Sequence, residues 1–402
     1  MTLVVDCDSH VMEPADLWQT WLEPRYRDRA IRIERREGVE HLIIGEKSVL
    51  SGVLAGLGGA HQDRSTLFTG DLCYADGCEP ASYEPAARVK MLDDWQVDYG
   101  VLFPTIGILP FPADDRDLSS AYCRAYNRWQ AAFLEGAPGR VAPIALVNWH
   151  DVDEAVRELT TCLKAGFRGL FVPPEVIDGR RPSDPHFDPI WRLCEEADVP
   201  GCLHVIVRFT GGAFGAWHET RPGTVFGFAM GATGQIIPAL SAMVTDLLFE
   251  RFPRLKMVSI EAGCGWAAYL MDRLDEKADV FRRLAPMPMK PSEYIRRNCW
   301  FVAEPEERTI GAMLDLVGED RILWGSDYPH VDSTLDASRL IRGSVASLSP
   351  ERQAAVLGEN ARKVFGLARS KASGASRTTA FSEGLTASIR ARCAPTASTL
   401  DT

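Results

Sequence analysis

The sequence lacks several features that mark other classes of protein. Its 10 cysteines include no CxxC pair, so neither a zinc knuckle nor a thioredoxin-like site is indicated. It lacks an excess of positive charge, because the formal net charge is -11, and this disfavours nucleic acid or an anionic membrane as a partner. It also lacks a secretory leader in MTLVVDCDSH and any run near the roughly 18 uninterrupted apolar residues of a membrane span. We therefore expect a cytoplasmic protein with reduced thiols that acts on a small-molecule substrate.

Short apolar runs alternate with amphipathic stretches along most of the chain. Runs such as LVVDCDSH, GRVAPIALVNW and DRILWGSDYP are nearly continuous in apolar residues, as expected for strands buried on both faces of a parallel sheet. An open doubly wound sheet would show the same alternation. Eight such repeats, with polar residues at the ends of the runs, favour an α/β fold of the closed (β/α)8 TIM-barrel type.

Three stretches fall outside this alternation. Residues 31–51 predict a β-hairpin that turns at Gly38, inserted after the first strand, and the Gly-rich insertion continues to about residue 85. Residues 208–238 predict a long loop after the fifth strand, and loops of this length on a barrel are usually functional.

The composition changes to Ser, Thr, Ala and Arg after Leu367. Such a segment cannot bury enough apolar surface to fold. We therefore predict one barrel domain over residues 1–367, with its insertion at about 31–85, and a disordered tail over residues 368–402.

Polar residues end several of the predicted strands. Asp6, Asp8 and His10 alternate in the first run, and period-two spacing points all three side chains to one face. Taken alone, Asp6 could cap a turn, and His204 could be a core residue whose hydrogen bonds are all formed within the protein. Carboxylates and imidazoles that converge at strand ends can instead coordinate Zn²⁺, Mn²⁺ or Fe²⁺. The other strand-end candidates are His204, Glu261 and Asp327.

The segments VDCDSHVMEP, LLFERFPRLKMVSIEAGCGW and RILWGSDYPHVD carry a family resemblance. The chain resembles the amidohydrolase superfamily, in the branch that includes aminocarboxymuconate-semialdehyde decarboxylase and γ-resorcylate decarboxylase. The resemblance implies one or two divalent metals per chain and a homodimer or homotetramer. It also implies the metal ligands Asp8, His10, His204 and Asp327.

One position departs from the decarboxylases of this branch. They carry a histidine at the end of strand six, where this chain has Glu261. Glu261 can be a general base, a further metal ligand or the partner of a cation, so the histidine-dependent route is in question.

The departure favours a metal-dependent hydrolase that uses a metal-activated water on an amide, ester, thioester or lactone bond of an apolar or aromatic molecule. Asp327 or Glu261 would take the proton of the water. The alternative is a metal-dependent non-oxidative decarboxylase of an aromatic or unsaturated acid, with the proton supplied by Asp327 or His218. A metal-free binding barrel is a third possibility, which the intact DCDSH and GSD segments disfavour.

Other residues are candidates for supporting roles. Asp6 and Glu13 are expected to hydrogen-bond a metal ligand, although Glu13 could equally cap the helix that follows it. Glu175 stands where binuclear relatives place a bridging ligand. Substrate contacts are expected from Arg208, which could pair with a carboxylate, and from Trp217, His218 and His330.

Overall fold

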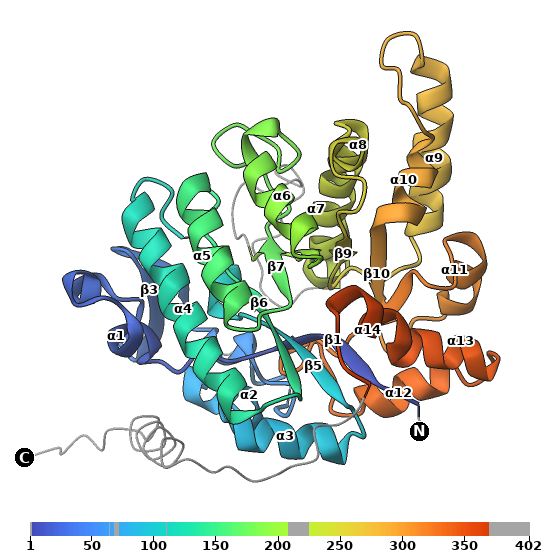
Figure 1. Cartoon of the computed structure of the whole chain (residues 1–402). Coiled ribbons are helices and arrows are strands. Elements are labelled where there is room, and N and C mark those ends of the chain that lie inside the picture. Colours follow the sequence, from blue (N-terminus) through green and yellow to red (C-terminus); the bar gives the residue numbers. More distant parts are fainter. Residues whose placement is uncertain (1, 64, 68–71, 110, 208–224, 370–402) are drawn as a thin grey trace, which may run out of the picture.

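A computed structural model describes residues 2–63, 65–67, 72–109, 111–207 and 225–369 of the chain (Figure 1). Eight parallel strands form one sheet in sequence order, each hydrogen-bonded to the next. The strands are β1 (Val5–His10), β5 (Tyr99–Phe103), β6 (Val141–Ala145), β7 (Gly169–Val172), β8 (Gly201–Leu203), β9 (Met257–Ser259), β10 (Cys299–Ala303) and β11 (Ile322–Trp324).

The sheet closes on itself between β1 and the residues just beyond β11. Ser9 forms a parallel bridge with Tyr328, and the His10 N–H donates to the Tyr328 carbonyl at 2.6 Å. Every strand residue of β1, β5, β6, β7, β8, β9 and β11 is buried, which explains the nearly continuous apolar runs. The predicted (β/α)8 barrel is confirmed.

Helices cover the outside of the barrel (Figure 1). Two of them begin at aspartate caps: the Asp115 carboxylate accepts the Leu118 N–H and the Asp151 carboxylate accepts the Glu154 N–H, both at 3.0 Å. The α-helices are α1 (Leu17–Trp21), α2 (Pro80–Tyr83), α3 (Pro85–Asp94), α4 (Arg116–Gly136), α5 (Val152–Lys164), α6 (Asp188–Glu196), α7 (Val225–Thr245), α8 (Leu248–Arg251), α9 (Ala267–Phe281), α10 (Pro291–Asn298), α11 (Ile310–Leu316), α12 (Ala337–Ser344), α13 (Pro350–Ala354) and α14 (Asn360–Phe365). Short 3-10 helices occupy Pro24–Arg29, Leu54–Leu57, Tyr74–Gly77, Ile106–Ile108 and Pro185–Phe187, and one π-helical turn occupies Ala355–Glu359.

The insertion after β1 is a three-stranded antiparallel sheet, one strand more than the predicted hairpin. Its strands are β2 (Arg32–Arg36), β3 (Val39–Ile44) and β4 (Lys47–Ser51). Gly38, with φ of 83°, makes the predicted turn, and Gly45, with φ of 61°, makes a second one. Glycine adopts these left-handed conformations without a steric penalty, so the second glycine turn adds the third strand.

Helix α7 qualifies the expectation about membrane spans. It is the one helix of the described residues that is long and apolar enough to cross a membrane, with a mean hydropathy of 1.3 over its best window. This criterion considers only the length and the composition of a helix. Its second half packs into the protein through buried Ile236, Leu240, Met243 and Val244, whereas Val225 at its start is 87% exposed.

Candidate metal centre

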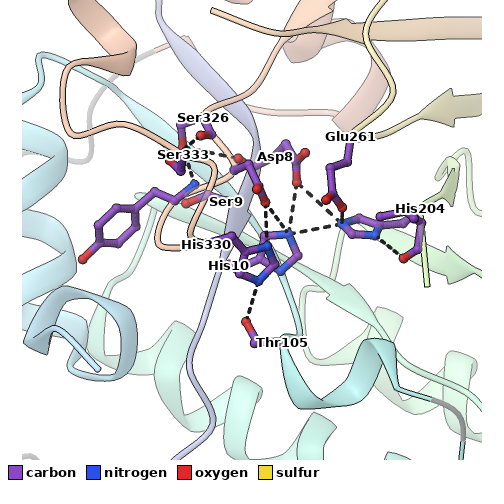
Figure 2. Close-up of polar contacts among 12 residues, drawn as sticks. Asp8, Ser9, His10, Thr105, His204, Glu261, Ser326, His330 and Ser333 are labelled. Atoms are coloured by element: carbon purple, nitrogen blue, oxygen red, sulfur yellow. Dashed lines mark hydrogen bonds and ion pairs between the residues drawn. The ribbon is translucent and has the colours of Figure 1, made fainter. Parts of the chain in front are cut away.

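Five side chains from four strands or strand ends meet at the mouth of the barrel, and Figure 2 labels four of them, Asp8, His10, His204 and Glu261. Asp8 and His10 belong to β1, His204 follows β8 directly, and Glu261 and Asp327 lie just beyond β9 and β11. His10 and His204 are fully buried. Residues separated by more than 300 positions in the sequence therefore form one cluster, as expected for the carboxyl ends of barrel strands.

The ring of His10 lies at the centre of this cluster. Its Nε2 atom is 3.3 Å from Asp8 Oδ1, 3.3 Å from Asp327 Oδ1 and 3.2 Å from His204 Nε2. His204 Nε2 is 3.7 Å from Asp8 Oδ1 and 3.6 Å from Glu261 Oε2. All these contacts are made by atoms that can ligate a metal ion.

The hydrogen bonds of the two histidines leave their Nε2 atoms free to ligate. His10 Nδ1 lies 2.7 Å from the Pro104 carbonyl, and His204 Nδ1 lies 2.8 Å from the Val205 carbonyl. A carbonyl can only accept, so each neutral ring carries its proton on Nδ1. Two Nε2 lone pairs then face each other at 3.2 Å, which is repulsive unless a cation is shared between them.

Unsatisfied carboxylate oxygens surround the same point. Asp8 Oδ1, Glu261 Oε2 and Asp327 Oδ2 are buried and have no hydrogen-bond donor among the described residues. Buried polar atoms are rarely left without partners, so the residues fit a divalent cation held by Asp8, His10, His204 and Asp327. Two carboxylates and two imidazoles suit manganese, iron or zinc.

The pKa shifts of the carboxyl groups show the same excess of negative charge. Burial raises the pKa of Glu261 well above its usual range, and neighbouring Asp8 raises it further. Burial and then Glu261 raise the pKa of Asp327 in the same way. Burial would also raise the pKa of Asp8, but the adjacent imidazoles of His10 and His204 outweigh burial and lower it. In the absence of a cation, these shifts therefore favour the protonated forms of Glu261 and Asp327 and the ionised form of Asp8.

The backbone at two of these residues has an uncommon conformation. Glu261 has φ of 56° and Asp327 has φ of 55°, a left-handed region that costs a non-glycine residue of order 1–3 kcal/mol. The Asp327 N–H donates to the Asp8 carbonyl at 2.8 Å and holds that conformation. Such strain is typical of functional sites.

The GSD segment, residues 325–327, packs against the neighbouring strand β1 and forms hydrogen bonds with it. A Cβ atom on Gly325 would lie 2.3 Å from Asp8 Cβ, so only glycine lets the two strands approach. Ser326 donates to Asp6 through its N–H at 2.8 Å and its hydroxyl at 2.6 Å. The Asp6 carboxylate is therefore occupied by Ser326, the residue before Asp327, and is not one of the carboxylates that face His10 and His204. Burial raises the pKa of Asp6 to about 7.

Glu13 takes neither of the two roles predicted for it, since among the described residues it hydrogen-bonds no metal ligand and does not cap α1. Its fully buried carboxyl group accepts main-chain N–H groups of the loop after β5 rather than capping α1. His330 lies inside the cluster as well: its Nδ1 is 2.8 Å from Asp327 Oδ1, and its ring is stacked on His10 with centroids 3.9 Å apart. His330 is 8% exposed, so it is a buried residue that lines the site.

The structure describes only one of the four remaining predicted residues. Arg208, Trp217 and His218 lie outside the described residues. In the part of the chain that the structure describes, Glu175 belongs to none of the groups of potential metal ligands. Two prolines separate Glu175 from the end of β7, so Glu175 is not at the strand end itself.

Two acidic residues at the mouth were not singled out from the sequence. Asp332 offers an oxygen within 4.8 Å of ligand atoms of Glu261 and Asp327. Glu304 follows β10 directly. Glu304 is exposed as a residue, but partial desolvation at the mouth, with Asp8 and Asp332 nearby, raises its pKa to about 8. The strand-end rule applied to CWFVAEP would have found Glu304.

The fold and this cluster define a (β/α)8 barrel with a candidate metal site at the carboxyl ends of its strands. The amidohydrolase family model matches residues 5–367. The chain therefore belongs to the amidohydrolase family, as its sequence motifs predict.

Individual relatives are distant but cover most of the chain. The 2-amino-3-carboxymuconate-6-semialdehyde decarboxylase of Dictyostelium discoideum is 23% identical over 295 residues, which are 71% of this chain and 77% of the relative. An amidohydrolase structure from Mycobacterium avium subsp. paratuberculosis is similar with a TM-score of 0.75 and 23% identity, over 92% of this chain and 99% of that chain. The 5-carboxyvanillate decarboxylase of Novosphingobium aromaticivorans, complexed with manganese and 4-hydroxy-3-methoxy-5-nitrobenzoic acid, has a TM-score of 0.67 at 19% identity, over 91% and 96% of the two chains.

Proposed function

We propose that the protein is a metal-dependent, non-oxidative decarboxylase of an aromatic or unsaturated carboxylic acid. The observation that carries the proposal is a group of ligand atoms from Asp8, His10 and His204 that could hold a cation, with the Glu261 carboxyl group 3.6 Å from His204. Both relatives named above with a stated reaction are decarboxylases. This reverses the order of the two functions expected from the sequence, where the hydrolase came first.

A divalent cation held by Asp8, His10, His204 and Asp327 would supply positive charge that binds and orients the acidic oxygens of the substrate. We expect this cation to be manganese, as in the carboxyvanillate decarboxylase. The protein contributes rigid ligands, because the Nδ1–H groups of both histidines are already bonded to carbonyl groups.

Decarboxylation replaces a bond from carbon to the carboxylate with a bond to hydrogen. The carbon that loses CO2 must therefore receive one proton. Glu261 can deliver it, because burial and neighbouring acids favour its protonated form. The side chain of Glu261 is 20% exposed, so it can regain a proton from solvent after each turnover. In this role Glu261 takes the place of the histidine that the decarboxylases carry after the sixth strand of the barrel, which is β9 in this protein.

Hydrolysis is the second candidate, and the same residue favours it. An ionised Glu261 beside His204 could take a proton from an attacking water molecule instead of giving one to carbon. The substrate would then be an amide, ester, thioester or lactone.

Product analysis separates the two functions. The purified protein, supplied with Mn²⁺, is incubated in H2¹⁸O with 5-carboxyvanillate, other hydroxybenzoic acids, and neutral esters and lactones of similar size. We expect one CO2 released for each acid consumed, and no ¹⁸O in the aromatic product. Turnover of an ester or lactone with ¹⁸O incorporation, and none of the acids, would overturn the proposal in favour of hydrolysis.

A further inference from the structure

We infer that Glu13 is a positioning residue of the metal centre, acting on His10 and His330 through the loop of residues 104–107. Glu13 touches neither histidine directly. The inference concerns the metal site and not the reaction proposed above, and its test needs no substrate.

The Glu13 carboxyl group gathers three consecutive main-chain N–H groups. Its Oε1 accepts from Thr105 at 3.1 Å and from Gly107 at 3.1 Å, and its Oε2 accepts from Ile106 at 2.8 Å. A run of N–H groups that converges on one anionic group is a recurrent way to fix a loop. The conformation is tight, since a Cβ atom on Gly107 would lie 2.6 Å from Pro104 Cβ.

The same short loop contacts both imidazoles of the site. The Pro104 carbonyl accepts the Nδ1–H of His10 at 2.7 Å. Thr105 Oγ1 lies 3.0 Å from His330 Nε2, a contact that Figure 2 shows. The first contact sets which nitrogen of His10 carries the proton, and hence that Nε2 faces Asp8 and Asp327. The second holds the ring of His330 with its other nitrogen toward Asp327.

Glu13 is itself held firmly enough to act as a support. The Met12 N–H donates to the Ser82 carbonyl at 3.0 Å, and the Glu13 carbonyl accepts the Tyr74 hydroxyl at 2.7 Å. These partners come from the insertion and from α2. These bonds hold the main chain of Met12 and Glu13 in place. The Glu13 side chain therefore extends from a fixed position to residues 105–107 and links the insertion to the loop that contacts the histidines.

A carboxyl group buried this completely is costly, because desolvation opposes its ionised form and raises its pKa to about 7. A neutral glutamine of the same shape would offer one acceptor oxygen and turn an NH2 group toward N–H donors. The loop would relax, and the carbonyl of Pro104 would no longer hold His10 in one orientation.

The test compares metal binding by the wild type, Glu13→Gln and Glu13→Asp. Asp275→Asn is the matched control, because the Asp275 carboxylate also accepts a main-chain N–H and a hydroxyl, both from Ser292, at the start of the remote helix α10. Mn²⁺ affinity is measured by competition with a chelator, and the visible spectrum of the Co²⁺-loaded protein reports ligand geometry. Urea unfolding of each metal-free variant gives its stability.

We expect Glu13→Gln to weaken Mn²⁺ binding by roughly 10- to 100-fold, the usual effect of losing a group that orients a metal ligand, and to change the Co²⁺ spectrum. Asp275→Asn should keep both at wild-type values even where it loses as much stability. If Glu13→Gln does not fold, Glu13→Asp, which withdraws the carboxyl by one methylene, should show a smaller loss of affinity. Wild-type affinity and spectrum in whichever Glu13 variant folds would show that Glu13 is merely structural and overturn the inference.

Discussion

Apart from the proposed metal ligands, the carboxyl groups on the two sides of the barrel mouth have different surroundings. On the side of β1 and β11, Asp6 and Glu13 are buried and receive hydrogen bonds from main-chain N–H groups. On the side of β9 and β10, Glu261 Oε2 is buried without a donor among the described residues, and Glu304 is exposed. In our proposals, the first side holds the metal ligands in place. The second side keeps a carboxyl group whose proton can be exchanged, which is what catalysis requires.

The largest expected effect is on the exchangeable side. Glu261→Gln should lower kcat by roughly 100- to 10,000-fold, the range for loss of a general acid or base, while Mn²⁺ affinity stays near the wild-type value. Steady-state kinetics on the acid identified by product analysis, with a chelator titration beside it, checks both. Full turnover in this variant would end the assignment of Glu261 as proton donor and weaken the contrast between the two sides.

The ligand side should show its effect in binding. His10→Ala removes the residue at the centre of the cluster. A transition-metal site contributes about 10–16 kcal/mol in favourable cases, so an equal share among four ligands predicts a loss of roughly 100- to 1,000-fold in affinity. Isothermal titration of the metal-free protein with Mn²⁺ measures it. Wild-type affinity here would mean that the cation binds elsewhere.

A pH titration of stability separates the metal-free from the loaded protein. In the unfolded chain the Glu13 carboxyl ionises near its ordinary pKa, whereas in the folded metal-free chain burial holds its pKa at about 7. The stability of the metal-free protein is therefore greatest at low pH within this window, and falls as pH rises from about 4.5 to about 7, by roughly 3 kcal/mol for Glu13 alone. Urea unfolding at pH 5 and pH 8 tests the sign, with Glu13→Gln expected to show a shallower fall. Stability that rises over this interval in the wild type would contradict it.

The smallest effect concerns the contact between β1 and β11. Gly325→Ala would place a Cβ atom 2.3 Å from that of Asp8, so the strands must separate at a cost of about 1–3 kcal/mol. Thermal unfolding of the metal-free protein measures it. Gly343→Ala, at a glycine with nothing within 4 Å of the added atom, is the control and should not be destabilised.

Much of this architecture could be predicted from the sequence, because strand ends in a barrel converge. The alternation of Asp8 and His10, and the strand-end positions of His204 and Asp327, identify the residues that the structure brings together. The same rule, applied to every strand, would have included Glu304.

The rest depends on contacts that leave no pattern in the sequence. The groups that orient His10 and His204 are carbonyls of Pro104 and Val205, and every residue has a carbonyl. Glu13 reaches a loop about 90 residues away, as its hydrogen bonds to 105–107 show. The third strand of the insertion depended on one glycine turn, at Gly45, that the hairpin pattern did not require.

The central claim is a single-cation site beside a Glu261 that binds no metal. Elemental analysis of the purified, Mn²⁺-saturated protein, wild type beside Glu261→Ala, tests it most directly. The account predicts one ion per chain in both proteins. Two ions in the wild type, falling to one in Glu261→Ala, would make Glu261 a ligand of a second cation with Asp327 and Asp332, and would contradict its role as the proton donor.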